Sequence, residues 1–276
     1  MSDKEKIADF AARAKREGRK ITMVAAYDYA MARLIDRSHV DMVLVGDSLA
    51  NVMLGLDSTV QVGMEEMIHH AKAVCRGAER APVIGDMPLG SYVTDVLALE
   101  NARRFIEEAG CDAVKLEWFD DCPAVAAKLI ADGISVMGHI GLTPQTAERF
   151  VVQGKDAASA QAIRDQAAQL SRSGCFALVL ECVPAELART ISREIPIATI
   201  GIGAGVHCDG QVLVAHDLLG LYDRFRPKFV KRYAALNEEV VKALDAYARE
   251  VAAGEFPGPQ HSYTVEPKVP KDQSTE

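Results

Sequence analysis

Long hydrophobic runs are absent from this 276-residue chain. No apolar stretch reaches the roughly 18 residues that suggest a membrane-spanning helix. Residues 1–20 are charged and rich in alanine, and they lack the apolar segment of a signal peptide. We therefore expect a cytoplasmic protein that does not enter a membrane.

The chain also lacks an excess of basic residues. Its 31 lysines and arginines are outnumbered by 39 aspartates and glutamates, which gives a formal net charge of −8. A nucleic-acid partner would need a basic face to neutralise its phosphates, so we expect none. The six cysteines form no C-x-x-C pair and have no histidine at zinc-finger spacing. This pattern favours reduced thiols in a cytoplasmic enzyme.

Short apolar runs alternate with amphipathic segments along the chain. Uninterrupted apolar runs of this length are typical of parallel strands that are buried on both faces. Seven such runs are present, at residues 21–27, 42–46, 82–85, 113–116, 135–138, 176–180 and 195–201. Residues 228–231 (KFVK) are a weaker eighth candidate.

Between these runs lie helical patterns. Residues 64–75 and 98–109 repeat apolar side chains at helical offsets, and Thr143-Pro144 has the form of an N-cap followed by a first-turn proline. This strand–helix alternation predicts a parallel sheet wrapped by helices. Because the length is close to the roughly 250 residues typical of a (β/α)8 TIM barrel, we expect a single α/β barrel domain over residues 1–276. A polar, flexible tail would begin at about residue 263. The structural alternative to the barrel is a doubly wound open sheet.

Polar side chains stand at the ends of several predicted strands. In a parallel barrel the carboxyl ends of all strands open on one face, and active sites lie there. The residues that the strands deliver to that face are Asp47, Ser48, Asp86, Lys115, Glu117, His139 and Glu181. Tyr27, at the end of the first strand, is either a further substrate contact or part of the packing.

The number of carboxylates on one rim predicts a divalent cation, because crowded carboxylates repel one another unless a positive charge holds them. Oxygen ligands without cysteine or paired histidine favour Mg²⁺, or Mn²⁺, over zinc. A 2-oxo acid could chelate such an ion through its carboxylate and keto oxygens. The ion would then stabilise an enolate, and a carboxylate that does not bind the ion would serve as the base.

A series of motifs resembles ketopantoate hydroxymethyltransferase (3-methyl-2-oxobutanoate hydroxymethyltransferase). The resemblance covers roughly residues 5 to 262 in collinear order. The motifs are residues 26–29 (AYDY), 44–49 (LVGDSL), 55–59 (GLDST), 86–88 (DMP), 114–117 (VKLE), 138–145 (GHIGLTPQ), 180–184 (LECVP), 200–205 (IGIGAG) and 209–212 (DGQV). It implies a (β/α)8 barrel of the phosphoenolpyruvate-mutase-like type, a homo-oligomer that is typically a decamer, and methylenetetrahydrofolate as hydroxymethyl donor to 2-oxoisovalerate in pantothenate synthesis.

The resemblance also implies a role for each rim residue. Asp47 and Asp86 would bind Mg²⁺, with Glu117 close by or reaching it through water. Glu181 would be the base that takes the proton from the carbon beside the keto group. The substrate-binding set would comprise Asp47, Ser48, Asp86, Lys115 and His139, to which the position of Tyr27 adds a sixth residue.

Two loops depart from the family pattern. Residues 118–120 (WFD) replace the usual glycines after Lys-x-Glu, and the segment between Gln145 and residues 152–154 (VQG) is about three residues shorter. These changes leave open a related lyase or aldol-type enzyme that acts on another 2-oxo acid. A non-catalytic barrel is the other alternative.

Overall fold

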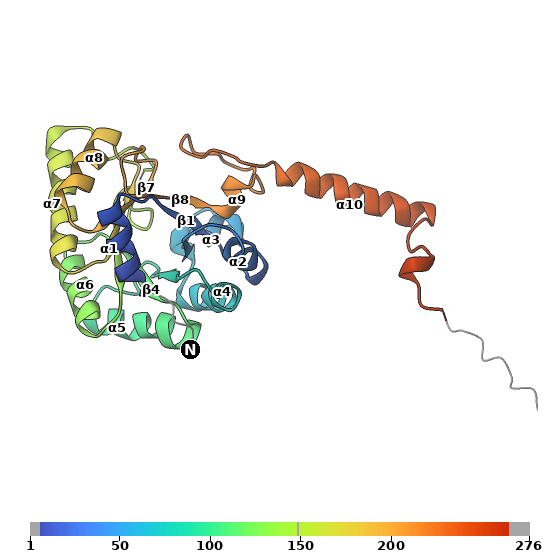
Figure 1. The fold of residues 1–276 in the computed structure, drawn as a ribbon, viewed down its shortest axis with the longest axis horizontal. Helices are drawn as coiled ribbons and strands as arrows, with labels where there is room; N and C mark the ends of the chain where they lie inside the picture. The colour runs from blue at the N-terminus through green and yellow to red at the C-terminus, as the bar shows by residue number, and fades with distance from the viewer. Residues whose placement is uncertain (1–5, 148, 265–276) are drawn as a thin grey trace, which may run out of the picture.

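Eight parallel strands close into a barrel in the computed structural model, which describes residues 6–147 and 149–264. Each strand pairs with its neighbours in chain order, and β8 closes the ring on β1 (Figure 1). The strands are β1 Ile21–Ala25, β2 Met42–Val45, β3 Val83–Asp86, β4 Ala113–Glu117, β5 Val136–Gly141, β6 Ala177–Glu181, β7 Ala198–Ile202 and β8 Gly210–Val214. The closure confirms the predicted barrel and excludes the open sheet.

The predicted eighth strand was wrong. Residues 228–231 form a turn, closed by a 3.0 Å hydrogen bond from the Val230 amide to the Pro227 carbonyl, followed by irregular chain. The true β8 follows β7 after a short loop without a helix, so it falls outside the strand–helix alternation on which the prediction relied. It also begins with glycine and glutamine, so its apolar run is short.

Helices cover the outside of the barrel (Figure 1). The helices of the described residues are α1 Ile7–Glu17, α2 Tyr29–Asp36, α3 Leu49–Val52, η1 Thr59–Gln61, α4 Met64–Gly77, α5 Asp95–Arg103, η2 Arg104–Ala109, α6 Cys122–Ala131, α7 Ala157–Arg172, α8 Ala185–Glu194, α9 Ala215–Leu218, α10 Leu236–Ala253 and η3 Pro259–His261, of which α10 and η3 lie away from the barrel (Figure 1). The predicted helix start at Thr143-Pro144 was wrong. There the amides of Thr146 and Ala147 both donate to the Thr143 carbonyl, and the chain makes a turn without continuing into a helix.

Helix α10 projects away from the barrel (Figure 1). None of its 18 residues is buried, although apolar side chains recur at helical spacing at Val240, Leu244, Tyr247 and Val251. No helix in the described part of the chain combines the length and the hydrophobicity needed to cross a membrane. The polar tail predicted from about residue 263 lies, from residue 265 on, outside the described residues.

Asp209, directly before β8, links several elements at the end of the barrel where the strands begin. The Asp209 carboxylate accepts hydrogen bonds from the amide of Thr199 at 2.8 Å and from Nζ of Lys15 at 2.7 Å. One side chain therefore joins helix α1 to strand β7, and its removal would leave the buried Thr199 amide without this acceptor.

We expect Asp209→Ala to lower the free energy of unfolding by about 2–3 kcal/mol, because unpaired buried donors cost more than a lost surface contact. Urea denaturation at one protein concentration measures this difference. The matched control is Glu79→Ala, whose carboxylate pairs with Arg33 at the surface and should cost about 1 kcal/mol or less. Equal losses in the two variants would show that Asp209 does not fasten the barrel.

Candidate active site

Seven polar side chains from five neighbouring strands meet in one cavity of about 860 Å³ at the carboxyl ends of the strands. They are the residues that the sequence predicted for this rim: Asp47, Ser48, Asp86, Lys115, Glu117, His139 and Glu181. They share this end of the barrel because each lies in the carboxyl-terminal half of a buried strand or just after it.

Tyr27 lies behind this wall. Its side chain is fully buried, it does not line the cavity, and its hydroxyl is 2.7 Å from Oγ of Ser48. Burial, opposed by the Ser48 hydrogen bond, raises the pKa of Tyr27, so the phenol keeps its proton. Of the two alternatives for Tyr27, the structure thus favours packing, with its hydroxyl orienting Ser48.

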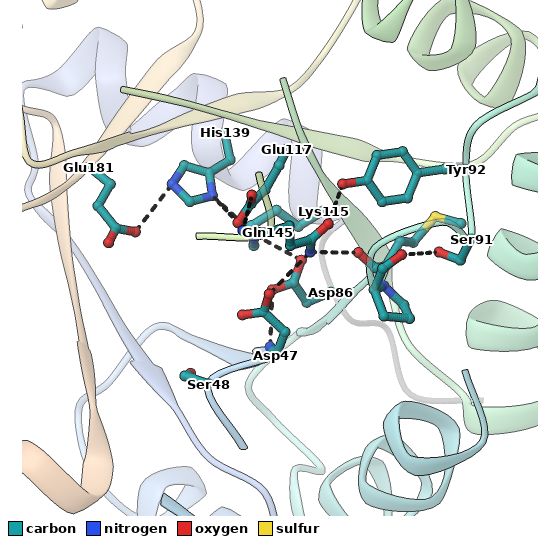
Figure 2. A network of polar contacts seen from close by, with 12 residues as sticks. Asp47, Ser48, Asp86, Ser91, Tyr92, Lys115, Glu117, His139, Gln145 and Glu181 are labelled. Atoms are coloured by element: carbon teal, nitrogen blue, oxygen red, sulfur yellow. Dashed lines mark hydrogen bonds and ion pairs between the residues drawn. The ribbon is translucent and has the colours of Figure 1, made fainter. Parts of the chain in front are cut away.

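Lys115 is the central cation of the site (Figure 2). Its Nζ atom lies 2.8 Å from Oδ1 of Asp86 and 4.0 Å from Oε1 of Glu117. Burial by itself would lower the pKa of Lys115, but the negative charges of Asp86, Glu117 and Asp47 outweigh burial and raise it. The lysine therefore stays charged although it is 3% exposed.

Three buried carboxylates surround this single lysine. Burial, followed by repulsion from Asp86 and Glu117, raises the pKa of Asp47 to about 8. Burial also raises the pKa of Asp86, although Lys115 opposes the shift. Both carboxyls therefore favour their protonated forms unless a further positive charge joins Lys115.

The unsatisfied oxygens in this cluster fit a divalent cation. Oδ1 of Asp86 meets Lys115 without hydrogen-bond geometry, and Oε1 of Glu117 is buried with no hydrogen bond. Within residues 6–147 and 149–264, no three His, Cys, Asp or Glu side chains converge as a ready-made metal cage. Mg²⁺ does not need such a cage, since one or two carboxylates together with water and substrate oxygens commonly suffice.

His139 connects the buried cluster to Glu181. Its Nε2 atom is 3.2 Å from Oε2 of Glu181, and its Nδ1 atom is 3.4 Å from Oε1 of Glu117 (Figure 2). Burial and Lys115 would lower the pKa of His139, but the two carboxylates raise it to about 9. Glu181 itself is more accessible than the cluster, with 16% of its side chain exposed. Among the four carboxylates that the sequence predicted for this rim, Glu181 is therefore the most exposed.

The prediction missed Gln145, which connects two of the carboxylates. Its amide Nε2 donates to Oδ2 of Asp47 at 3.1 Å and to the Met87 carbonyl at 3.0 Å, and its backbone amide donates to Oε2 of Glu117 at 3.0 Å. Gln145 is 3% exposed. It carries no charge and follows the strand by four residues, so a search for charged strand ends could not find it.

Tyr92 fixes the orientation of the Gln145 amide. Its hydroxyl donates to Oε1 of Gln145 at 2.5 Å, which leaves the nitrogen of the amide to face Asp47 (Figure 2). Burial, followed by the charges of Glu117 and Asp86, raises the pKa of Tyr92, so its hydroxyl remains a donor. A polar chain therefore runs from Tyr92 through Gln145 to Asp47.

Glu181 owes its place to a close approach between strands β5 and β6. Gly141 has φ +94°, and the Leu142 amide next to it donates to the Glu181 carbonyl at 2.9 Å. A Cβ atom on residue 141 would come within 2.3 Å of that carbonyl oxygen. Cys182, directly after Glu181, also has a left-handed backbone with φ +49°. The local backbone thus sets the direction in which Glu181 leaves its strand.

The sequence comparison decides the family. Residues 4–259 match the model of the ketopantoate hydroxymethyltransferase family. The chain belongs to this family. A relative from Moorella thermoacetica, named 3-methyl-2-oxobutanoate hydroxymethyltransferase, is 55% identical over 90% of this chain and 94% of its own length. A relative of the same name from Heliobacterium modesticaldum is 52% identical over 92% of this chain and 94% of its own length.

Solved structures support the predicted type of barrel. A phosphonopyruvate hydrolase superposes with a TM-score of 0.62 at 12% identity, covering 95% of this chain and 92% of its own. A 2,3-dimethylmalate lyase, described as a member of the PEP mutase/isocitrate lyase superfamily, gives 0.58 at 14% identity, covering 97% and 91%. The fold of this family member is therefore the phosphoenolpyruvate-mutase-like barrel.

We expect Gly141→Ala to lower the free energy of unfolding by more than about 2 kcal/mol, because the new methyl group must displace backbone. Gly90→Ala is the matched control: Gly90 also has a positive φ, of +82°, but a Cβ there meets nothing within 4 Å. The control should lose only about 1 kcal/mol from backbone strain. Chemical denaturation of both variants measures the difference, and equal losses would rule out the close contact as the cause.

Proposed function

We propose that this protein transfers a hydroxymethyl group from methylenetetrahydrofolate to 3-methyl-2-oxobutanoate, giving ketopantoate for pantothenate synthesis. The observation that carries the proposal is the division of the cavity floor into two parts. One part is the buried cluster around Lys115, which suits an anionic oxo acid and a cation. The other is the more accessible Glu181, which His139 separates from that cluster.

Asp47 and Asp86 would hold Mg²⁺ or Mn²⁺, with Glu117 acting through water. Burial and mutual repulsion, which raise the pKa of Asp47 and of Asp86, support this assignment, as does the buried Oε1 of Glu117, which makes no hydrogen bond. When bound, the ion polarises the keto group of the oxo acid and stabilises the enolate.

The remaining residues bind the oxo acid and move its proton. Lys115 pairs with the anionic oxygens of the substrate, and the Ser48 hydroxyl, oriented by Tyr27, donates a further hydrogen bond. Glu181 takes the proton from the carbon beside the keto group. His139, 3.2 Å from Glu181, steers the carboxylate toward that carbon and stabilises its negative charge before the proton moves.

The two alternatives, a related lyase or aldol-type enzyme and a non-catalytic barrel, have less support than the hydroxymethyltransferase. Relatives that are 52% and 55% identical carry the hydroxymethyltransferase name, and likeness to a lyase at 14% identity concerns the fold alone. A non-catalytic barrel would not need to keep every residue of the mechanism on one cavity. We accordingly expect a cytoplasmic biosynthetic enzyme.

Glu181→Gln should slow α-proton exchange of 3-methyl-2-oxobutanoate in D₂O by about 10²–10⁴-fold, because the amide cannot accept the proton. Proton NMR with Mg²⁺ and without folate measures this step apart from the donor. The variant should still bind Mg²⁺, whereas Asp47→Asn and Asp86→Asn should lose it. Rapid exchange in Glu181→Gln would exclude Glu181 as the base. Failure of the native enzyme to form ketopantoate would overturn the proposed function.

Gln145→Met should weaken Mg²⁺ binding by about 10- to 100-fold, because the apolar side chain cannot donate to Asp47. Tyr92→Phe should have a smaller effect, since the amide remains but loses its orienting hydrogen bond. Isothermal titration calorimetry without substrate measures both. Gln161→Met, on the outer helix α7, is the control and should bind the ion normally. Unchanged affinity in Gln145→Met would show that the amide does not support the ion.

We also propose that the protein is a homo-oligomer, with a decamer as the expected assembly. The support is helix α10, whose apolar side chains remain about half exposed in the described part of a single chain, where Tyr247 contacts the Phe256 ring. Contact with a neighbouring copy would bury them.

Leu244→Glu combined with Tyr247→Glu should therefore dissociate the assembly, since it places charge in an apolar contact. Multi-angle light scattering after size exclusion measures the mass. Lys242→Glu changes the charge of an exposed residue on the same helix and should leave the mass unchanged. An unchanged mass in the double variant would argue against this role of α10.

A further inference from the structure

The cavity is much larger than the oxo acid needs. Its volume of about 860 Å³ lies in the range of sites for drug-sized ligands, whereas 3-methyl-2-oxobutanoate has only five carbons. The polar residues described above form its floor. The walls above them come from the segments that follow strands β5, β6, β7 and β8. A second, larger ligand therefore has room in the same cavity.

Two exposed phenylalanines from distant parts of the chain line this cavity, and we call the surface that they and their apolar neighbours form its mouth. Phe150 lies on the segment after β5 and is 70% exposed, and Phe225 lies on the segment after α9 and is 67% exposed. Phe229, half-buried, and Val151 line the same mouth. One exposed phenylalanine is unremarkable, but several apolar side chains around one opening mark a binding surface for a flat ring.

A lysine completes this mouth. Lys228 lines the cavity between Phe225 and Phe229 in the sequence and makes no hydrogen bond or ion pair within residues 6–147 and 149–264. The arginines of the same segment are engaged elsewhere, since Arg224 lies 3.9 Å from Asp57 and Arg226 donates to the Val230 carbonyl. Lys228 is thus a cation available to an anionic ligand in this cavity.

We infer that Phe150, Phe225, Phe229 and Lys228 form the binding subsite for the one-carbon donor, which rests on the proposed function. The donor methylenetetrahydrofolate has flat rings at one end and a glutamate with two carboxylates at the other. The rings lie against the phenylalanines, and the glutamate faces Lys228. The shortened loop after Gln145 contributes Phe150 and Val151, so the part of the chain that departs from the family pattern forms part of the donor wall.

The test separates donor binding from the chemistry on the oxo acid. Phe225→Ala and Phe150→Ala should each raise the KM for methylenetetrahydrofolate about ten-fold, as expected for loss of an aromatic stacking contact. Their KM for the oxo acid and their donor-independent α-proton exchange should stay within about two-fold of the native values. Tyr233→Ala is the matched control, because Tyr233 is 66% exposed on the same segment but does not line the cavity.

Lys228→Ala should raise the donor KM about two- to five-fold at low salt, the range of an exposed ion pair. The effect should be smaller with methylenetetrahydropteroate, which has one benzoate carboxylate in place of the two carboxylates of the glutamate. Lys231→Ala is the control, since Lys231 lies over the Tyr233 ring and outside the cavity. A Lys228 effect of equal size with the two donors would overturn the assigned orientation.

Other outcomes overturn the subsite without touching the proposed function. Unchanged donor KM in both phenylalanine variants, with native exchange, would place the donor elsewhere. A change in oligomeric mass in these variants would make the phenylalanines a contact between copies of the chain. Absence of exchange and of ketopantoate formation in the native enzyme would instead defeat the proposed function. In that case the affinities of the native and variant proteins for tetrahydrofolate, measured by direct titration, would still test the subsite: equal affinities would overturn it.

Discussion

The site depends on the burial of one lysine among three carboxylates. A buried charge is costly unless it is paired, and breaking such a pair leaves an uncompensated charge in the interior. Lys115 has Asp86 on the neighbouring strand β3 and Glu117 two residues further along its own strand β4. Because β3 and β4 pair in register at Asp86 and Lys115, the backbone ladder of the barrel brings the two charges together.

Further polar residues contact the crowded carboxylates and hold them in place. Gln145 directs its amide and backbone N–H groups at Asp47 and Glu117, and Tyr92 prevents the amide from turning over. His139 lies between the cluster and Glu181, so the positive charge that it carries is shared by carboxylates on both sides. The floor of the cavity is therefore polar, fully packed and fixed in place, as catalysis by preorganised charges requires.

The mouth of the cavity differs from the floor in being apolar and in lying on loops. Its apolar side chains lie on segments after the strands, where the chain length and composition can vary without disturbing the ladder. A family member can therefore alter the loop after Gln145 and keep the charged floor intact. Helix α10 shows the same independence, since its 18 residues add nothing to the barrel core.

The sequence by itself determined the parts that follow from local patterns. Seven strands were predicted from uninterrupted apolar runs. Because strand ends in a parallel barrel share one face, the polar residues at these ends predicted the site: Asp47, Ser48, Asp86, Lys115, Glu117, His139 and Glu181. Only the tertiary structure decided the identity of β8, which lacks a preceding helix and is recognisable as a strand through its pairing with β1. It also decided that Lys228 and Phe229 line the cavity, that Tyr27 lies behind Ser48, and that Gln145 contacts two carboxylates. These relations depend on contacts between residues far apart in the chain, which periodicity cannot encode.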